Sequence, residues 1–416
     1  MEGELNKLKP LIDKCVLCGG CHPDCPTYQL TRYERDSARG KVLLADALLK
    51  GDLRPTPELA SVFGHCLSCM ACTQACPAGA DPAKVIIAAR GDFFKKTGGL
   101  AEKLVFRKIL TTTRLMPFLS AFLRMGAALS KFFPRLPGIS GFSRDGRQKI
   151  FPIFTNARLK DRFPAKIPAK GKRIMSVAYF TGCMADWAFQ TDGAAVINIL
   201  SSAGADVTLV GGEVCCGAPA YFAGDFEAAR LSAGKNVGAF AGGGFDFIVT
   251  SCATCGSVLR EVYPEILPTA ESTAFVSKIT DFQKLYVETL SANVAIRKKS
   301  GEKIRVTYHD PCHLSRGMKV TKEPREILKN LPDVEFVEMK EPDSCCGGAG
   351  MFNVKHYSDS LEIGRRKGRN IVECGAQIVV TECPSCQMQL MDITARYSPG
   401  VTVLHMADFL SRFAGG

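Results

Sequence analysis

Residues 245–255, "FDFIVTSCATC", join an apolar run to two cysteines that are separated by two residues. The β-branched and aromatic residues before the cysteines are typical of a buried β-strand. Residues 376–386, "AQIVVTECPSC", repeat the same arrangement. A strand that ends in a Cys-x-x-Cys pair therefore occurs twice, which indicates an internal duplication.

Further apolar runs that end in cysteines surround these two stretches. They are residues 173–183 ("RIMSVAYFTGC"), 206–216 ("DVTLVGGEVCC"), 304–312 ("IRVTYHDPC") and 334–346 ("VEFVEMKEPDSCC"). Helical segments alternate with them, which predicts two small α/β units with mostly parallel sheets. Since open α/β sheets bind ligands at the carboxyl ends of their strands, we expect the cysteines to gather at that edge.

Each unit contains the same set of five cysteines. A single cysteine is followed after 31 or 32 residues by Cys-Cys-Gly, and later by Cys-x-x-Cys. The first five-cysteine set is Cys183, Cys215, Cys216, Cys252 and Cys255. The second five-cysteine set is Cys312, Cys345, Cys346, Cys383 and Cys386. Five thiolates are one more than a cubane cluster needs, which favours a larger or irregular cluster.

The adjacent cysteines at 215–216 and 345–346 are poor candidates for disulfides. Neighbouring Cα atoms lie about 3.8 Å apart, whereas a relaxed disulfide needs roughly 4.4–6.8 Å. A strained vicinal disulfide is the alternative for each pair. The glycines that follow both pairs leave room for an inorganic cluster against the backbone.

Two further cysteine motifs lie near the N-terminus. Residues 15–26, "CVLCGGCHPDCP", and 66–77, "CLSCMACTQACP", both read C-x2-C-x2-C-x3-C-P, the bacterial ferredoxin run for 4Fe–4S cubanes. In two-cluster ferredoxins the fourth cysteine binds the partner cluster. We therefore expect cluster A at Cys15, Cys18, Cys21 and Cys76, and cluster B at Cys66, Cys69, Cys72 and Cys25. Two structural zinc sites are the alternative, but they need neither the third step nor the terminal proline.

The spacing of these motifs and the changes in composition along the chain predict four segments. About 50 helix-compatible residues separate the two motifs, which indicates a helical ferredoxin type of domain over residues 1–95. A helical, then Pro- and Lys-rich connector follows at 96–170, and the α/β units are expected at 171–300 and 301–416. The basic, apolar part of the connector is either an amphipathic helix pair packed on its neighbour or an element that faces a partner or a membrane.

Composition indicates the cellular compartment of the protein and the kinds of partner it has. The 416 residues contain an odd number of cysteines, 19, and begin without the apolar region of a signal peptide, so we expect a cytoplasmic protein with metal-binding thiols. No run of about 18 apolar residues predicts a membrane span. The formal net charge of +12 is partly cancelled by anionic clusters, so we expect no nucleic-acid partner.

The pattern of the two five-cysteine sets resembles the cysteine-rich "CCG" domain family. Two ferredoxin motifs followed by two such domains resemble the glycolate or lactate oxidase iron–sulfur subunit, and also the D-type catalytic subunit of membrane-linked heterodisulfide reductase. Residues 25–53 are similar to the segment after the first motif in the glycolate and lactate group. "YHDPCHLSRG" at 308–317 is common to both groups. The resemblance extends from about residue 12 to 410.

The resemblance implies an electron-transfer subunit. A separate FAD-containing dehydrogenase would oxidise glycolate or D-lactate, and electrons would pass through two cubanes and the clusters of the two sets to a quinone or another acceptor. A membrane quinone-reactive subunit or the inner face of the cell membrane is a further expected contact. The alternative is a heterodisulfide reductase type of enzyme, in which noncubane 4Fe–4S clusters at Cys215, Cys216, Cys345 and Cys346 reduce a disulfide.

Several other residues bear on this interpretation. The glycine-containing stretches lack G-x-G-x-x-G between a strand and a helix, so we expect no FAD or NAD in this chain. Cys374 lies outside both sets and is expected to be a buried apolar residue. His309 and His313 flank Cys312 and either donate to a cluster or pack at the end of the strand.

Overall fold

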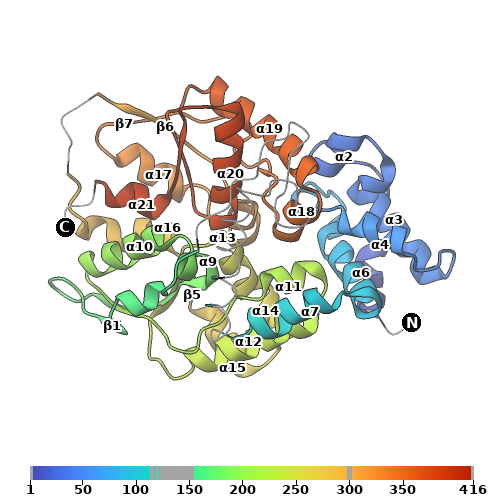
Figure 1. The fold of residues 1–416 in the computed structure, drawn as a ribbon, viewed down its shortest axis with the longest axis horizontal. Helices are drawn as coiled ribbons and strands as arrows, with labels where there is room; N and C mark the ends of the chain where they lie inside the picture. Colours follow the sequence, from blue (N-terminus) through green and yellow to red (C-terminus); the bar gives the residue numbers. More distant parts are fainter. Residues whose placement is uncertain (1–2, 113–116, 118–120, 122–153, 298–301, 414–416) are drawn as a thin grey trace.

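The computed structural model describes residues 3–112, 117, 121, 154–297 and 302–413. A helical N-terminal part lies on one side of the molecule, and two α/β parts stacked on each other form the rest (Figure 1). This architecture confirms the predicted fold class of an all-α part followed by two α/β domains.

The N-terminal part is built from helices around a small apolar core. Its longer helices are α3 (Ala38–Lys50), α4 (Pro57–Gly64) and α6 (Pro82–Thr97); the shorter ones include α1 (Lys9–Asp13), α2 (Pro26–Thr31) and α5 (Ala71–Gln74). Ser37 and Asp81 cap α3 and α6 by accepting hydrogen bonds from backbone amides. Val42, Ala45, Phe63 and Ile86 are among the buried residues that hold these helices together.

The first sheet has the strand order β1-β3-β2-β4-β5. Its strands are β1 (Lys166–Ile167), β2 (Met175–Phe180), β3 (Ala205–Thr208), β4 (Phe247–Thr250) and β5 (Ile279–Asp281). Among these described strands, only β1 is antiparallel to its neighbour. The helices α9 (Gly182–Trp187), α10 (Gln190–Ser202), α11 (Ala218–Ala223), α12 (Phe226–Phe240) and α13 (Ala253–Ser257) belong to this part.

The second sheet has the strand order β7-β6-β8-β9. Its strands β6 (Ile304–Tyr308), β7 (Val334–Phe336), β8 (Ile378–Thr381) and β9 (Thr402–His405) are all parallel. Its helices include α17 (Glu323–Asn330), α18 (Gly350–Lys355), α19 (Tyr357–Glu373), α20 (Pro384–Tyr397) and α21 (Met406–Ser411). The order β3-β2-β4-β5 therefore corresponds to β7-β6-β8-β9, which confirms the duplication. The edge strands β5 and β9 were not predicted from the sequence.

Two elements do not respect the expected segment limits. Helix α6 continues through Thr97, past the expected boundary at residue 95, and strand β1 pairs with β3 although it precedes residue 171. The described start of the connector forms α7 (Leu100–Leu104) and the helical turn Val105–Ile109. Most of the predicted amphipathic helix pair lies outside the described residues.

The two sheets share one cluster of buried apolar residues, which includes Val207, Phe282 and Phe409.

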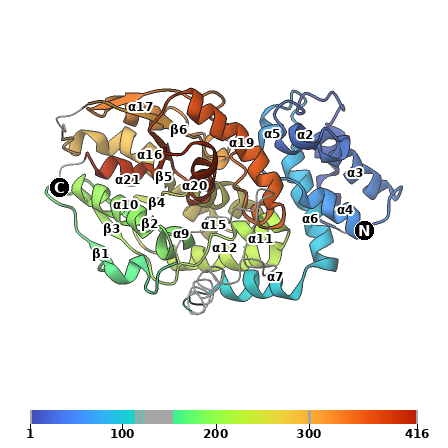
Figure 2. The same cartoon turned by 45° about the horizontal axis from the view of Figure 1, so that its top comes forward.

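Helix α6 also joins the N-terminal part to the first α/β part, against α11 (Figure 2). Gly224 follows α11 with φ +97°, and a Cβ on it would lie 2.6 Å from the carbonyl carbon of Arg90 and 2.7 Å from the nitrogen of Gly91. A Cβ on Gly91 would in turn lie 2.3 Å from the ring of Phe226. Glycine is therefore required on both sides of this contact.

Gly224→Ala is expected to destabilise the protein by two separate effects. The left-handed conformation costs about 1–2 kcal/mol for a residue with a Cβ, and overpacking against the α6 backbone adds about 1–3 kcal/mol. Gly51→Ala is the matched control, because Gly51 also has a positive φ but its Cβ would meet no atom within 4 Å. Urea unfolding of the two holoproteins measures the difference. Equal losses of stability would show that the α6–α11 contact is not tight.

Candidate metal centres

The two ferredoxin-type loops have the same backbone geometry. Leu17 and Ser68, which stand at matching positions between the first two cysteines of each motif, both have left-handed backbone with φ of 55° and 52°. Gly19 and Met70 also correspond and have φ of 78° and 60°. Such turns direct successive amides inward. Accordingly, the Ser68 amide donates to the Cys66 Sγ at 3.4 Å, and the Gly20 amide to the Cys18 Sγ at 3.5 Å.

The structure brings together the four cysteines expected for cluster B. Cys25, Cys66, Cys69 and Cys72 line one small cavity of about 20 Å³ in the N-terminal part. Burial raises the pKa of Cys72, and the thiols of Cys66 and Cys69 raise it further. The fourth cysteine of the first motif thus lies with the first three of the second.

The cysteines expected for cluster A lie nearer the surface. Cys18 is exposed and Cys21 is buried, and burial together with Cys25 and Cys15 raises the pKa of Cys21. A Cβ on Gly20 would lie 3.6 Å from the Cys18 Sγ and 3.7 Å from the Cδ of Pro77, the residue after Cys76. The first motif therefore meets the end of the second. That these eight cysteines hold clusters stays a prediction.

Both five-cysteine sets gather at the carboxyl edges of their sheets. In the first set the thiols of Cys183 and Cys215 interact, as do those of Cys216 and Cys255. Hydrogen bonds from Cys215 and Cys255 lower the pKa of Cys216 to about 6. In the second set the corresponding cysteine, Cys346, has a pKa well below its usual range because Cys345 and Cys386 donate to it. The pKa of Cys383 in the second set is also well below its usual range, because Cys252 and Cys386 donate to it.

The two sets contact each other through their Cys-x-x-Cys pairs. The thiols of Cys252 and Cys383 interact, and the Thr254 Oγ1 lies 3.5 Å from the Cys383 Sγ. The backbone closes the same junction, since the Ala253 amide donates to the carbonyl of Glu382 at 3.0 Å. The spacing of the two sets along the sequence indicates two separate sites and does not predict this contact.

The second set also contacts the ferredoxin-type part. The thiol of Cys69 interacts with both Cys312 and Cys345, and these residues pack together in one buried apolar cluster. Arg316 holds this junction by donating to the Gln74 Oε1 at 2.8 Å, the Cys69 carbonyl at 3.3 Å and the Asp343 carboxylate at 2.9 Å. An unbroken row of thiols thus leads from the cluster B cysteines through the second set to the first.

His309 lies against the second set. Its Nδ1 donates to the carbonyl of Pro342 at 3.2 Å, so Nε2 is the nitrogen left to face the thiols. A ring nitrogen of His309 and the Sγ atoms of Cys346 and Cys386 all lie within 4.8 Å of one another. Nε2 has no nitrogen or oxygen partner in the part of the chain that the structure describes. His309 is therefore placed to contact whatever metal group the second set holds.

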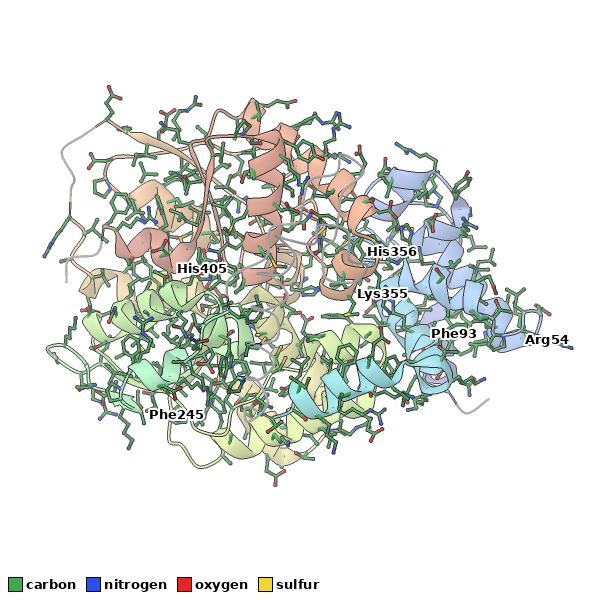
Figure 3. The ribbon with its side chains drawn as sticks, in the orientation of Figure 1. Arg54, Phe93, Phe245, Lys355, His356 and His405 are labelled. Carbon is green, nitrogen blue, oxygen red and sulfur yellow. The ribbon has the colours of Figure 1, made fainter. Side chains whose placement is uncertain are left out.

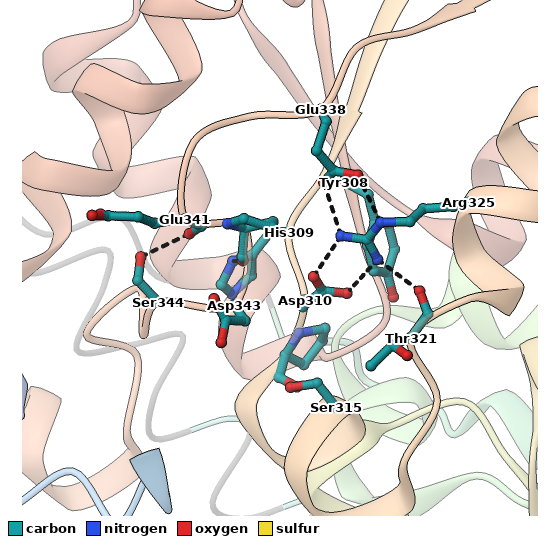
Figure 4. A network of polar contacts seen from close by, with 12 residues as sticks. Tyr308, His309, Asp310, Ser315, Thr321, Arg325, Glu338, Glu341, Asp343 and Ser344 are labelled. Atoms are coloured by element: carbon teal, nitrogen blue, oxygen red, sulfur yellow. Dashed lines mark hydrogen bonds and ion pairs between the residues drawn. The ribbon is translucent and has the colours of Figure 1, made fainter. Parts of the chain in front are cut away.

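A polar network fixes the loop that carries His309 and Cys312. The Arg325 guanidinium donates to both carboxylate oxygens of Asp310, at 3.0 and 2.7 Å, and to Glu338 at 2.7 Å (Figure 4). Because Asp310 lies between His309 and Cys312 in the chain, this bidentate ion pair holds the backbone of both residues in place.

Two protein-family models match the parts of the chain that contain these cysteines. The model of the cysteine-rich CCG domain matches residues 177–260 and 306–391, and the 4Fe–4S dicluster domain model matches residues 11–80. The chain is 30% identical to the probable glycolate oxidase iron–sulfur subunit of Bacillus subtilis, over 99% of this chain and 97% of the relative. The chain belongs to the glycolate oxidase iron–sulfur subunit family.

The chain is also similar to two proteins with other names. One subunit of the dihydromethanophenazine:CoB–CoM heterodisulfide reductase of Methanosarcina acetivorans is 26% identical over 92% of this chain and 88% of its own. Lactate utilization protein A of Oceanobacillus iheyensis is 29% identical over 58% of this chain and 99% of its own. Among the described residues, no helix combines the length and the hydropathy needed to cross a membrane.

The surroundings of the cysteines fit the anionic clusters that this family's domains imply. Lys41 and Lys367 are both 1% exposed, and each donates to backbone carbonyls, Asp36 O and Pro342 O respectively. Burial lowers the pKa of both lysines, and nearby thiolates oppose this shift: Cys66 and Cys25 for Lys41, Cys346 and Cys312 for Lys367. A buried ammonium needs a compensating charge. Thiolate-bound clusters beside both lysines would supply it.

His309→Ala is expected to weaken the hold on iron in the second set by about 10–100-fold, as loss of such supporting contacts does in metal sites. The rate of cluster loss to an iron chelator under anaerobic conditions measures this effect. Cys374→Ser is the control, because Cys374 lies outside both sets and its thiol donates to the Ile371 carbonyl at 3.2 Å. Equal rates in the two variants would mean that His309 only packs at the end of its strand.

His313 has a different position from His309. Its Nδ1 lies 3.3 Å from the Thr254 Oγ1, its Nε2 lies 3.1 Å from the Ser68 carbonyl, and its ring stacks on Phe222. It therefore joins all three parts of the chain. Cys374, expected to be buried, is only partly buried.

Proposed function

We propose that this chain is the iron–sulfur electron-transfer subunit of a flavin-dependent 2-hydroxyacid dehydrogenase of the glycolate or D-lactate class. Family membership supports the proposal, as do the names of the relatives from Bacillus subtilis and Oceanobacillus iheyensis. The observation that carries it is the unbroken row of thiols from Cys69 through the second set to the first. Such a row is what stepwise electron transfer between neighbouring centres requires.

In this proposal each cysteine group holds one 4Fe–4S cluster. The ferredoxin-type cysteines hold cubanes A and B as grouped above, and each five-cysteine set holds one noncubane cluster. Clusters in these sites would supply one-electron transfer. The chain's own contribution is to order the sites, since the second set contacts both cluster B and the first set. Electrons that enter at cluster A or B therefore reach the first set through the second.

The partner in this proposal is an FAD-containing dehydrogenase. The chain lacks a dinucleotide-binding motif, and iron–sulfur clusters exchange single electrons, whereas oxidation of a hydroxyacid starts with hydride removal. A flavin accepts the hydride from the hydroxyacid and passes its two electrons on one at a time. The electrons leave to a quinone or another acceptor, and a membrane quinone-reactive subunit or the membrane surface is a further contact of the complex.

Anaerobic co-purification and reconstitution test this function. The isolated holoprotein should not oxidise glycolate or D-lactate in the presence of a dye, whereas addition of the co-purifying flavoprotein and substrate should bleach the cluster absorbance. Oxidation of either hydroxyacid by the isolated chain would contradict the proposal.

Disulfide reduction is the second candidate function, favoured by the relative from Methanosarcina acetivorans and by the complete five-cysteine sets. It predicts that the chemically reduced holoprotein reduces a small disulfide without any flavoprotein, and that Cys345→Ala abolishes this activity. Absence of the activity in protein with a full cluster content would exclude it.

A further inference from the structure

A cavity of about 290 Å³ lies where the three parts of the chain meet. Its walls come from α4 and α6 of the N-terminal part, from α11 of the first α/β part, and from α18 of the second. Phe93, Lys355 and His356, labelled in Figure 3, mark the junction of the blue and the orange segments that border it. We refer to this cavity as the junction pocket.

The junction pocket borders three of the proposed cluster sites. Cys66, a cluster B cysteine, forms part of its wall. Thr254 and Ser385, which occupy the same position within the two Cys-x-x-Cys pairs, also line it. The Thr254 hydroxyl, 3.5 Å from the Cys383 Sγ, links the wall directly to the second set. A molecule in this pocket would lie beside the middle of the row of thiols.

The lining suits a flat ring. Phe93, Phe94, Phe222 and Phe352 line the pocket, and the ring of His313 stacks on Phe222 at a centroid distance of 5.0 Å and an interplanar angle of 24°. Aromatic rings prefer such offset or edge contacts with other rings. The Ser385 hydroxyl is a polar group that could donate a hydrogen bond to a ring carbonyl, whereas the Thr254 hydroxyl already donates to the Nδ1 of His313.

The pocket is poorly suited to an anionic ligand. Arg90, on its wall, already donates to the Phe63, Cys66 and Phe222 carbonyls at 2.9, 2.5 and 2.7 Å. Lys355 forms an ion pair with Glu102 at 2.6 Å. All five N–H groups of Arg90 are taken, since they also donate to the Gly64 carbonyl and the Ser68 hydroxyl. Among the described residues of the wall, the guanidinium therefore offers the carboxylate of a charged disulfide no hydrogen bond in place of those it loses from water. An uncharged acceptor avoids that cost.

We propose that the junction pocket binds the headgroup of a quinone as the electron acceptor, an inference that rests on the proposed electron-transfer function. Its volume is at the lower end of the roughly 300–1,000 Å³ usual for ligand pockets, which fits a single ring system. One quinone takes two electrons, passed singly from the adjacent sites, and two protons from solvent, and leaves as the quinol. The Lys355 side chain, 56% exposed, places solvent at the rim.

Two variants that fill the pocket from two different helices, α4 and α11, test the inference. A Cβ on Gly64, at the end of α4, would meet no atom within 4 Å, so Gly64→Phe adds a ring where there is room. Ala223→Phe adds one from the end of α11. Gly234→Phe is the matched control, because Gly234 lies on the exposed face of α12 and its Cβ also meets nothing. Iron content and the visible spectrum verify the clusters in each variant.

Anaerobic calorimetric titration of the oxidised holoproteins with menadione gives the first measurement. The wild type and Gly234→Phe should bind menadione with dissociation constants within about twofold of each other, and both filled variants should bind it about tenfold more weakly or worse. No binding to the wild type, or equal binding by all four proteins, would overturn the inference. Displacement of menadione by an equal concentration of glutathione disulfide would assign the pocket to disulfides instead.

A kinetic measurement separates this inference from the proposed function. With flavoprotein and hydroxyacid, the clusters of all four proteins should be reduced at the same rate, and only the filled variants should be reoxidised slowly by menadione. If the flavoprotein reduces no protein but the filled variants still lose menadione binding, the proposed function fails and the pocket assignment stands. Unchanged reoxidation in both filled variants overturns the pocket assignment alone.

Discussion

Cys346→Ala is expected to stop the flavoprotein partner from reducing either five-cysteine set, whereas Cys216→Ala is expected to affect the first set alone. The second set contacts the cluster B cysteines through Cys69, and within the described residues the thiols of the first set are linked to this row at the Cys252–Cys383 contact. Loss of the central thiol of the second set therefore isolates the first. Electron transfer to the first set should fall by more than the ~100-fold that loss of an outer contact produces in metal sites.

Electron paramagnetic resonance after rapid freezing distinguishes the two variants. In Cys346→Ala, signals of clusters A and B should appear on addition of substrate and flavoprotein, and the signal of the first set should be absent. Dithionite, a small reductant, should still reduce the first set in that variant, which shows that the cluster is present. Equal reduction of the first set in both variants would mean that electrons enter it by another route.

Arg90→Met is expected to destabilise the holoprotein by about 3–5 kcal/mol, because loss of one partner leaves several buried acceptors unsatisfied. The Arg90 guanidinium donates to the carbonyls of Phe63, Gly64, Cys66 and Phe222 and to the Ser68 hydroxyl. It thereby ties the loop that carries Cys66 to both α6 and α11. Methionine keeps much of the length of the side chain but supplies none of these donors.

Urea unfolding followed by the visible spectrum of the clusters measures this loss. Arg54→Met is the control, since Arg54 is exposed at the far end of the N-terminal part (Figure 3). Surface changes of this kind usually alter stability by no more than about 0.5 kcal/mol. Similar unfolding midpoints for the two variants would show that the carbonyls around Arg90 find other partners, such as water in the junction pocket.

Local patterns carried most of the fold prediction. The strands before Cys183, Cys252, Cys312 and Cys383 were predictable because apolar β-branched runs are a local signal. The edge strands β5 and β9 were not predicted, because neither is followed closely by one of the cysteines that mark the other strands of the repeat. Their place beside β4 and β8 follows from the pairing of the whole sheet.

The sequence by itself determined which cysteines lie together within each loop, because the span between neighbouring cysteines is set by covalent geometry. Only the tertiary structure decided the order of the groups. The contacts of Cys69 with Cys345 and of Cys252 with Cys383 join residues from different parts of the chain. They exist because buried surfaces on the helical part and on two similar sheets pack together, and spacing along the chain carries no record of that packing. The junction pocket arises from the same packing.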